Sequence, residues 1–430
     1  MAAANAAAAA AAAAAAPSAT LLGLDRIPEA QPWLETGPFW SSLDRATAEL
    51  DPPFGVLSLD ALRHNAHDML RRAGGTPIRV ASKSIRVRSV IEELLQLPGY
   101  RGVLGYTLAE ALWLAETVDD VVVGYPTVDR AAIRRLATSP ELAARVTIMV
   151  DSPAQLDVVD AVLPPALRED IRVCLELDAS WNSAVLGHIG VLRSPVHDAD
   201  AAASLAQYIE GRAGFTLVGM MAYEAQIAGV GDKPVGKPLD GAVKRWMQSQ
   251  SIEELHARRA SAVAAVRRVA DLEFVNGGGT GSLESTHDDG SVTEIGAGSG
   301  IFGGHLFDNY SRFTPAPAAS FAMSIVRRPA PDTATILGGG WIASGPPAPD
   351  RLPKIVWPAG LSMAPRESAG EVQTPVTGRA ARTLRPGDRV WMRHTKSGEL
   401  AEHLNDYVLV DGDTVVGTTP TYRGEGKAFL

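Results

Sequence analysis

Lys83 is the residue of this sequence whose type and position most directly suggest covalent chemistry. It ends the run Pro77-Ile-Arg-Val-Ala-Ser-Lys83, and a helical pattern over 87–97 comes after it. The apolar residues in this run predict a short buried strand that ends on the lysine. At the tip of such a strand an amine is half desolvated, which makes it a usable nucleophile towards an aldehyde. An ordinary surface lysine just past a strand end is the competing interpretation.

Two glycine-rich segments further along the chain are suited to holding an anion. They are Asn276-Gly-Gly-Gly-Thr-Gly-Ser282 and Gly296-Ala-Gly-Ser-Gly300. Glycines let backbone N–H groups approach an anion, and Thr280 and Ser299 can add hydroxyl donors. One such loop is most often a plain turn, but two of them together with Lys83 form a stronger set. A reactive lysine and a phosphate cradle are what pyridoxal phosphate requires, as covalent partner and as anchor.

The elements that must position these residues are eight short strand-like runs, and helical patterns fill most of the gaps between them. The runs are Ile78–Ser82, Gly102–Tyr106, Asp120–Tyr125, Arg145–Val150, Ile171–Asp178, Leu217–Tyr223, Leu272–Asn276 and Glu294–Gly298. This alternation predicts parallel pairing and favours a closed (β/α)₈ TIM-type barrel over an open, doubly wound sheet. Barrel sites lie at the C-terminal ends of the strands, and the loops after strands seven and eight often hold a phosphate. The two glycine-rich segments fall at these two positions.

We expect four parts along the chain. These are a disordered Ala-rich tail (1–20), a Pro- and Trp-rich wrapping segment (21–53), the barrel (54–310) and a mostly antiparallel C-terminal β domain (311–430). The last part rests on β-type runs separated by Pro/Gly turns, such as the turn at 386–388. The tail has neither the basic region nor the Leu-rich core of a secretory signal.

Composition excludes some functions and compartments. The chain has 46% hydrophobic and 21% charged residues and a formal net charge of −9, so we expect no nucleic-acid partner and no anionic-membrane surface. Outside the N-terminus no stretch is apolar enough to span a bilayer. The single cysteine, Cys174, cannot form an intramolecular disulfide and fits a reducing compartment. We therefore expect a cytoplasmic protein.

The motifs also carry a family resemblance. Val80-Ala-Ser-Lys-Ser84 resembles the lysine strand of the fold-type III pyridoxal phosphate enzymes, the alanine racemase-like barrels. Residues 54–430 are most similar to the D-threonine aldolase and D-serine dehydratase branch, and in particular to bacterial proteins called amino acid deaminase/aldolase. Further matching segments are Tyr106-Thr-Leu-Ala-Glu110, Gly124-Tyr-Pro126, His188-Ile-Gly-Val-Leu-Arg-Ser-Pro195, Met221-Ala-Tyr-Glu224, Thr293-Glu-Ile-Gly-Ala-Gly298 and Arg393-His-Thr-Lys-Ser-Gly-Glu399.

The resemblance implies roles for individual residues. Lys83 would form the Schiff base with the cofactor. The phosphate would be held by Gly278, Gly279, Thr280, Gly298 and Ser299, in the loop that Asn276 opens and in the loop after strand eight. Tyr223 would face the cofactor as a catalytic group, with a tyrosine that only packs at the barrel rim as the alternative. Arg193 and Gln226 would contact the ring or the substrate, and Asn182 stands where an arginine is expected.

The same branch places a divalent metal, such as Mn²⁺, Zn²⁺ or Mg²⁺, beside the cofactor through a His-x-Asp or His-x-Cys pair in the β domain. Here Glu402-His-Leu-Asn405 offers His403 and Asn405. The alternation of a strand would place these two side chains on one face, as two ligands require. An amide in place of a carboxylate or thiol departs from the pattern of the family.

The implied activity is that of a lyase acting on β-hydroxy-D-amino acids, by aldol cleavage or by β-elimination and deamination. The resemblance also implies a homodimer in which His403 and Asn405 face Lys83 of the other subunit. A racemase or epimerase on the same cofactor is the alternative, with Tyr407 or Tyr422 as its second acid/base group. A non-catalytic pyridoxal phosphate carrier is a third possibility, but such carriers consist of the barrel alone.

Overall fold

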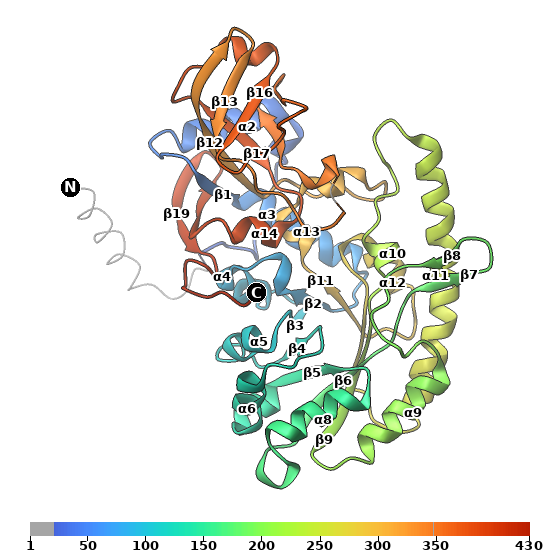
Figure 1. The fold of residues 1–430 in the computed structure, drawn as a ribbon. Coiled ribbons are helices and arrows are strands. Elements are labelled where there is room, and N and C mark those ends of the chain that lie inside the picture. Colours follow the sequence, from blue (N-terminus) through green and yellow to red (C-terminus); the bar gives the residue numbers. More distant parts are fainter. Residues whose placement is uncertain (1–20, 347) are drawn as a thin grey trace.

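Two sheets organise the molecule, a closed barrel and a separate, mostly antiparallel sheet (Figure 1). The computed structural model of the protein describes residues 21–346 and 348–430. The expected Ala-rich tail (1–20) lies outside the described residues. In Figure 1 the barrel fills the lower half of the view and most of the second sheet lies above it.

The barrel consists of eight parallel strands in the order β10-β11-β2-β3-β4-β5-β6-β9, which confirms the predicted fold class. Its strands are β2 (Ile78–Ala81), β3 (Tyr100–Gly105), β4 (Val121–Val123), β5 (Val146–Val150), β6 (Ile171–Glu176), β9 (Phe215–Ala222), β10 (Phe274–Gly277) and β11 (Glu294–Ala297). The ring closes where β11 pairs with β2, with Ala297 opposite Val80. This register brings the loop after β11 next to the turn that carries Lys83.

Helices connect most of the barrel strands, and a short hairpin of β7 (Trp181–Ser183) and β8 (Gly187–Ile189) extends one loop. The helices of this part are α3 (Leu59–Arg72), α4 (Arg88–Leu94), α5 (Leu108–Leu114), α6 (Arg130–Ala137), α7 (Pro140–Arg145), α8 (Pro153–Val162), α9 (Ala199–Glu210), α10 (Ala225–Ala228), α11 (Pro238–Val266), α12 (Leu283–His287) and α13 (Ser299–Phe302). Within the described residues, no helix combines the length and the apolar character needed to cross a membrane.

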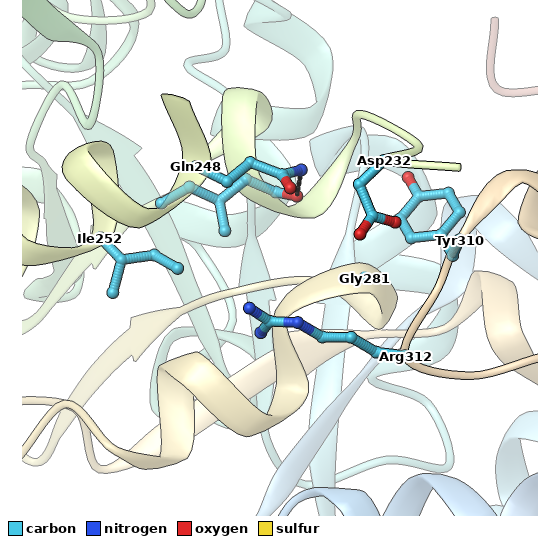
Figure 2. Close-up of a pocket in the computed structure, with 7 residues that line it drawn as sticks. Asp232, Gln248, Ile252, Gly281, Tyr310 and Arg312 are labelled. Carbon is cyan, nitrogen blue, oxygen red and sulfur yellow. Dashed lines mark hydrogen bonds between the residues drawn. The ribbon is translucent and has the colours of Figure 1, made fainter. Parts of the chain in front are cut away.

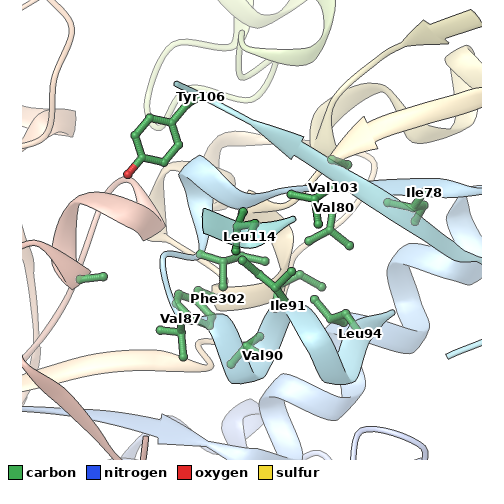
Figure 3. Packing of buried hydrophobic residues seen from close by; sticks show 14 of the residues in the cluster. Ile78, Val80, Val87, Val90, Ile91, Leu94, Val103, Tyr106, Leu114 and Phe302 are labelled. Carbon is green, nitrogen blue, oxygen red and sulfur yellow. The ribbon is translucent and has the colours of Figure 1, made fainter. Parts of the chain in front are cut away.

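The strand that leads to Lys83 is held by the packing of β2 against α4 (Figure 3). Val90, Ile91 and Leu94 repeat at the spacing of one helix face and are fully buried. They share one hydrophobic cluster with Ile78 and Val80 of β2. Each such side chain contributes about 1.5–3 kcal/mol when it leaves water. The short turn η2 (Ser82–Ser84) therefore begins from a fixed strand end.

Nine strands form the second sheet. They are β1 (Phe54–Ser58), β12 (Ala319–Ala330), β13 (Thr333–Leu337), β14 (Lys354–Trp357), β15 (Ser362–Met363), β16 (Gln373–Thr377), β17 (Arg389–Arg393), β18 (Asp406–Asp411) and β19 (Thr414–Pro420). β15 and β16 were not predicted, because one has two residues and the other is polar with Pro375 in its centre. Around this sheet lie helix α14 (Ser397–Ala401) and the 3₁₀ turns η6 (Pro349–Arg351) and η7 (Arg379–Arg382).

One boundary of the expected division needs correction. β1 was assigned to the barrel part, but it pairs with β12 and, in parallel, with β18 of the second sheet. Its burial on both faces, typical of a central parallel strand, gave no sign of which sheet it joins. We propose a barrel part that begins at α3, and a second part formed by β1 together with the residues after 310.

The segment before β1 packs against the second sheet. It contains η1 (Pro32–Leu34) and α2 (Thr36–Ala46), and the ring of Trp40 lies 6.4 Å from that of Trp391 of β17. The indole N–H of Trp391 donates to Asp44 Oδ1 at 2.9 Å, and Arg389 forms an ion pair with the same carboxylate.

The C-terminal segment returns to the barrel through Glu110, a fully buried carboxyl group at the start of α5. The hydroxyl of Tyr422 donates to Glu110 Oε1 at 3.0 Å, and the backbone N–H of Tyr106 donates to Oε2 at 2.7 Å. Burial is the main cause that raises the pKa of Glu110 to about 7, above its ordinary value of 4.5. Between these two pH values, Glu110 therefore keeps a proton in the folded protein that it has already released in the unfolded chain.

We predict that stability falls as the pH rises from about 5 to about 7, and that Glu110→Gln flattens this slope. Because the folded pKa of Glu110 is raised, its contribution is complete below the ordinary pKa and is lost as the pH passes about 7. The difference in unfolding free energy between variant and wild type should shift by on the order of 3 kcal/mol over this range. Urea unfolding at pH 5 and pH 8 measures it.

Glu176→Gln is the variant to compare with Glu110→Gln. It removes a second carboxyl group whose pKa burial raises to about 7, at a separate site. Parallel stability–pH curves for wild type and Glu110→Gln would contradict the assignment of this proton to Glu110.

Candidate active site

A cavity of about 680 Å³ opens at the C-terminal ends of the barrel strands. Its barrel wall carries Lys83, Tyr125, Arg193, Tyr223 and the two glycine-rich loops. Its second wall comes from the part of the chain that builds the second sheet, and we call it the second-sheet wall. It consists of Ser344, Gly345, Pro346, Arg351 and residues 395–399. The two walls bring residues that are distant in sequence to one space.

Lys83 projects into this cavity from η2, and its Nζ donates to the hydroxyl of Tyr125 at 2.8 Å. Its side chain is exposed, whereas the sequence pattern predicted a half-desolvated amine, because the turn after β2 carries it beyond the buried strand. Burial alone would raise the pKa of Tyr125, but the neighbouring charges of Lys83 and Arg193 outweigh it and leave that pKa lowered. The phenol beside the lysine is thus more acidic than an isolated tyrosine.

Arg193 follows the β7–β8 hairpin and covers two aromatic rings of the barrel wall. Its guanidinium carbon lies 4.6 Å from the ring centroid of Tyr223 and 5.3 Å from that of Tyr125. One guanidinium nitrogen is 3.9 Å from Glu176 Oε1. Burial raises the pKa of Tyr223, although the charge of Arg193 opposes this rise. A half-buried cation therefore lies between two phenols at the cavity wall.

The two glycine-rich loops are bound to each other through Thr280. Its hydroxyl oxygen accepts from the Ser299 hydroxyl and from the Gly300 N–H, each at 3.1 Å. A Cβ atom at residue 298 would overlap the carbonyl oxygen of Ala81, so glycine lets the second loop approach the Lys83 turn. A Cβ atom at residue 279 would come within 2.9 Å of the Ala228 side chain. The loops thus line the cavity with backbone and two hydroxyl groups.

Glu224, next to Tyr223, holds the first glycine loop from behind. Its carboxylate accepts from the N–H of Gly278 at 2.9 Å and from the hydroxyl of Thr286 at 2.8 Å, and it pairs with Arg259 at 3.0 Å. Gly278 has φ +79°, a conformation that favours glycine. Because the Gly278 N–H and the Ser299 hydroxyl already donate inside the protein, the hydroxyl of Thr280, which accepts in both of its bonds, is the clearer anion donor.

Most of the residues predicted for the site lie in this cavity. Those that line it are Lys83, Arg193, Tyr223, Asn276, Gly278, Gly279, Thr280, Gly298 and Ser299. Gln226 is not among the lining residues. It is buried, and its amide donates to the Ala179 carbonyl at 2.7 Å and to Ser251 Oγ at 2.9 Å. Asn182 lies on the exposed β7–β8 hairpin and contacts His188.

The predicted metal pair lies outside the cavity wall. His403 and Asn405 are in the turn between α14 and β18, so the strand alternation expected for them does not exist. The ring of His403 stacks on Trp341 at 4.8 Å, and the Asn405 carbonyl accepts from the Thr421 N–H. Across the described part of the chain, no group of three or more His, Cys, Asp or Glu residues is arranged to hold a metal ion.

The sequence predictions missed Tyr125 and the second-sheet wall. Tyr125 had a usable signal, since it ends a predicted barrel strand. Lys396 and Glu399 lie in one of the matching segments, but nothing in local periodicity shows that this segment reaches the barrel. A second hollow, lined by Asp232, Gln248, Ile252, Gly281 and their neighbours, has a volume of only about 10 Å³ (Figure 2). It holds no more than about one water molecule.

The cavity fits pyridoxal phosphate. Its volume is within the range of small-molecule sites, about 300–1,000 Å³. An amine for the aldehyde lies at Lys83, and the glycine loops offer the hydroxyls of Thr280 and Ser299 to a phosphate. The close approach of the second loop to Ala81 shows that only a residue without a side chain can occupy position 298.

Comparison with known proteins agrees with this geometry. Residues 57–305 match the family model described as alanine racemase, N-terminal domain. The 3-hydroxy-D-aspartate aldolase of Paracoccus denitrificans (strain Pd 1222) is 27% identical over 59% of this chain. That alignment spans 61% of the relative's own length, which is less than two thirds. The D-threonine aldolase of an Arthrobacter species is 26% identical over 70% of this chain and 76% of its own.

Solved structures share the fold over most of this chain. The D-threonine aldolase of Filomicrobium marinum superposes with a TM-score of 0.72 at 20% identity, covering 88% of this chain and 96% of its own. The D-threo-3-hydroxyaspartate dehydratase of Delftia sp. HT23 has a TM-score of 0.65 at 18% identity, covering 86% and 97%. With a family model that covers more than half of its length and a barrel that carries the lysine turn and both glycine loops, the chain belongs to the alanine racemase N-terminal domain family of pyridoxal phosphate barrels.

Proposed function

We propose that the protein is a pyridoxal phosphate-dependent lyase that acts on β-hydroxy-D-amino acids, by aldol cleavage or by β-elimination with deamination. The observation that carries this proposal is the amine of Lys83, bound to Tyr125 at 2.8 Å and facing both glycine loops across one cavity. The names of the relatives support the substrate class, since each describes an aldolase or dehydratase of a β-hydroxy-D-amino acid.

The proposed division of roles follows from the cavity walls. Lys83 would hold the aldehyde group of the cofactor, and Thr280, Ser299 and the glycine backbone would hold its phosphate. Asn276 and Tyr223 line the wall between them. Pyridoxal phosphate, when bound, draws into its ring the electron pair that bond cleavage leaves on the α-carbon of the substrate.

The protein groups around Lys83 are suited to moving a proton. With pyridoxal phosphate bound, Lys83 would be the amine placed to exchange a proton with the substrate α-carbon. The hydroxyl of Tyr125, acidified by Lys83 and Arg193, can hold or return a proton at Lys83 Nζ. The guanidinium of Arg193 can orient an anionic group of the substrate or the cofactor near Tyr223.

The racemase alternative is less well supported. It requires a second acid/base group, for which Tyr407 and Tyr422 were the candidates. Neither lines the cavity: Tyr407 packs its ring against Phe302, and the hydroxyl of Tyr422 is bound to Glu110. The second-sheet wall also weighs against a carrier without catalytic function, because it brings a further lysine and a carboxylate to the site. We include no metal at His403 and Asn405, since neither lines the cavity.

A homodimer and a cytoplasmic location remain proposals. The location rests on the single cysteine, Cys174, which is buried as a free thiol. The second-sheet wall of each chain already faces its own Lys83, so the dimer that we propose does not depend on His403 of the partner subunit to complete the site. Light scattering during gel filtration should give twice the mass of the chain, and a monomer would contradict the proposed assembly.

We predict that borohydride reduction of the protein loaded with pyridoxal phosphate attaches the cofactor to Lys83. The amine and the two glycine loops line one cavity, whereas Lys354 is not among the lining residues and is paired with Asp308. Peptide mapping by mass spectrometry identifies the labelled lysine, and Lys83→Ala is the control that should lose the label. Labelling of Lys396 or Lys354 instead would refute the assignment.

The activity itself is tested by incubating the loaded protein with D-threonine, D-threo-3-hydroxyaspartate and D-serine. We expect acetaldehyde or glyoxylate if the Cα–Cβ bond breaks, and a keto acid with ammonia if the β-hydroxyl group leaves. Lys83→Ala should form none of these products. Conversion to the L-isomers without any carbonyl product would favour the racemase alternative over the lyase.

A further inference from the structure

Lys396 is a second amine in the cavity, and helix α14 fixes its backbone against the barrel. It is the residue immediately before α14. A Cβ atom at Gly398 would overlap the carbonyl oxygen of Lys83, so α14 is in direct contact with the lysine turn. The Ser397 hydroxyl also donates to the Ser299 carbonyl at 3.0 Å, and Glu402 pairs with Arg86 at 2.6 Å. These contacts between α14 and the barrel therefore hold the backbone of Lys396 beside the cavity.

The side chain of Lys396 is also oriented. Its Nζ donates to the hydroxyl of Ser344 at 2.9 Å, and the Ser344 N–H donates to the carboxylate of Glu399 at 3.1 and 3.2 Å. Ser344 thus connects the amine to the only side-chain carboxylate of the described cavity wall. Through Ser344, Glu399 stabilises the ammonium form of Lys396 without a direct ion pair. When Lys396 is a free amine, its nitrogen can still accept a proton.

The charges that face Lys396 come from both walls. Burial and the positive charges of Arg351 and Lys83 lower the pKa of Lys396, while Glu399 and Tyr125 act in the opposite direction. A lysine with a lowered pKa is available as a general base at neutral pH more often than a surface lysine. The influence of Lys83 and Tyr125 also shows that the two amines share one electrostatic environment.

The donor set of the cavity does not suit a transition metal. Among the described lining residues there is one side-chain carboxylate, Glu399, and no His, Cys or Asp. A divalent ion at a catalytic site usually takes three protein ligands. Cleavage of a β-hydroxy amino acid nevertheless requires a group that receives the hydroxyl proton, and the second-sheet wall supplies Lys396 for it.

We propose that Lys396 is a catalytic base that takes the proton of the substrate's β-hydroxyl group when the Cα–Cβ bond breaks, in place of a metal-bound group. This inference rests on the proposed function. The hydroxyl proton passes to Nζ of Lys396, and the oxygen electron pair forms the C=O bond of the aldehyde product. The pair of the broken Cα–Cβ bond stays with the α-carbon, which then gains a proton from Lys83 to give glycine.

The test uses the full-length protein loaded with pyridoxal phosphate and compares Lys396→Met and Lys396→Arg with wild type. Lys244→Met is the matched control, because it removes a lysine from a surface ion pair with Asp240 on α11. Cleavage of D-threonine should fall by about 100-fold or more in both Lys396 variants and stay unchanged in the control. Recovery in Lys396→Arg, which keeps the charge but cannot act as a base, would overturn the proposal. So would a wild-type enzyme that loses activity in chelator and regains it with a divalent metal.

Exchange of the glycine α-hydrogen with D₂O, followed by NMR, separates this role from cofactor binding or folding. The exchange involves the α-carbon and Lys83 but no β-hydroxyl group. It should persist in Lys396→Met and disappear in Lys83→Ala. Loss of exchange in Lys396→Met would overturn the proposal, because it would show a general defect of the site.

Reductive methylation of the cofactor-free protein gives a readout that does not depend on activity. Isotope labelling and peptide mass spectrometry should show a lower pH midpoint for modification of Lys396 than of Lys244, and equal midpoints would overturn the free-amine role. Wild type that exchanges glycine but neither cleaves nor dehydrates a β-hydroxy-D-amino acid would refute the proposed function, and this inference with it. Dehydration without any cleavage would overturn this inference alone. Full cleavage in Lys396→Met would refute this inference alone.

Discussion

The closure of the barrel between β11 and β2 is the constraint on which the site depends. Arg79 of β2 and Glu294 of β11 form an ion pair at 2.6 Å, and both side chains are almost fully buried. Asp120 forms a second ion pair with Arg79, with 2.8 Å between Oδ1 and Nη1. Removal of one partner of such a pair leaves an uncompensated buried charge, at a cost of about 3–5 kcal/mol. The same register places Gly298 against Ala81, and therefore the second glycine loop beside the Lys83 turn.

The charged side chains that line the cavity beside this closure are mainly positive. Among the described lining residues, four cationic side chains line it in addition to Lys83, namely Arg86, Arg193, Arg351 and Lys396, against the single side-chain carboxylate of Glu399. The chain as a whole carries a formal net charge of −9, so this concentration of positive charge is local. An anionic cofactor and an amino acid carboxylate both enter such a site favourably, because low-dielectric walls strengthen the attraction.

The barrel could be predicted from the sequence, because its strands are short apolar runs and its helices have one apolar face, as in Val90, Ile91 and Leu94. Lys83 and the glycine loops were predictable for the same reason, since strand ends of a parallel barrel meet at one rim. The second-sheet wall was not. Lys396 reaches the cavity through tertiary contacts of Gly398 and Ser397, which leave no periodic signal. For His403 the prediction assumed a strand, and the actual turn points its ring at Trp341.

The membership of β1 in the second sheet has a consequence for biosynthesis. β1 precedes the barrel in the chain, but its parallel partner β18 follows it, so the whole barrel is translated before that pair can form. The lysine turn and both glycine loops therefore emerge from the ribosome before β18 and the second-sheet wall have been synthesised, while β1 is still unpaired. Such an interval exposes an apolar strand with open edges, the condition in which chains aggregate or recruit chaperones. If the chain were cut once after the barrel to produce two polypeptides, β1 would remain with the barrel and would be separated from the rest of its own sheet.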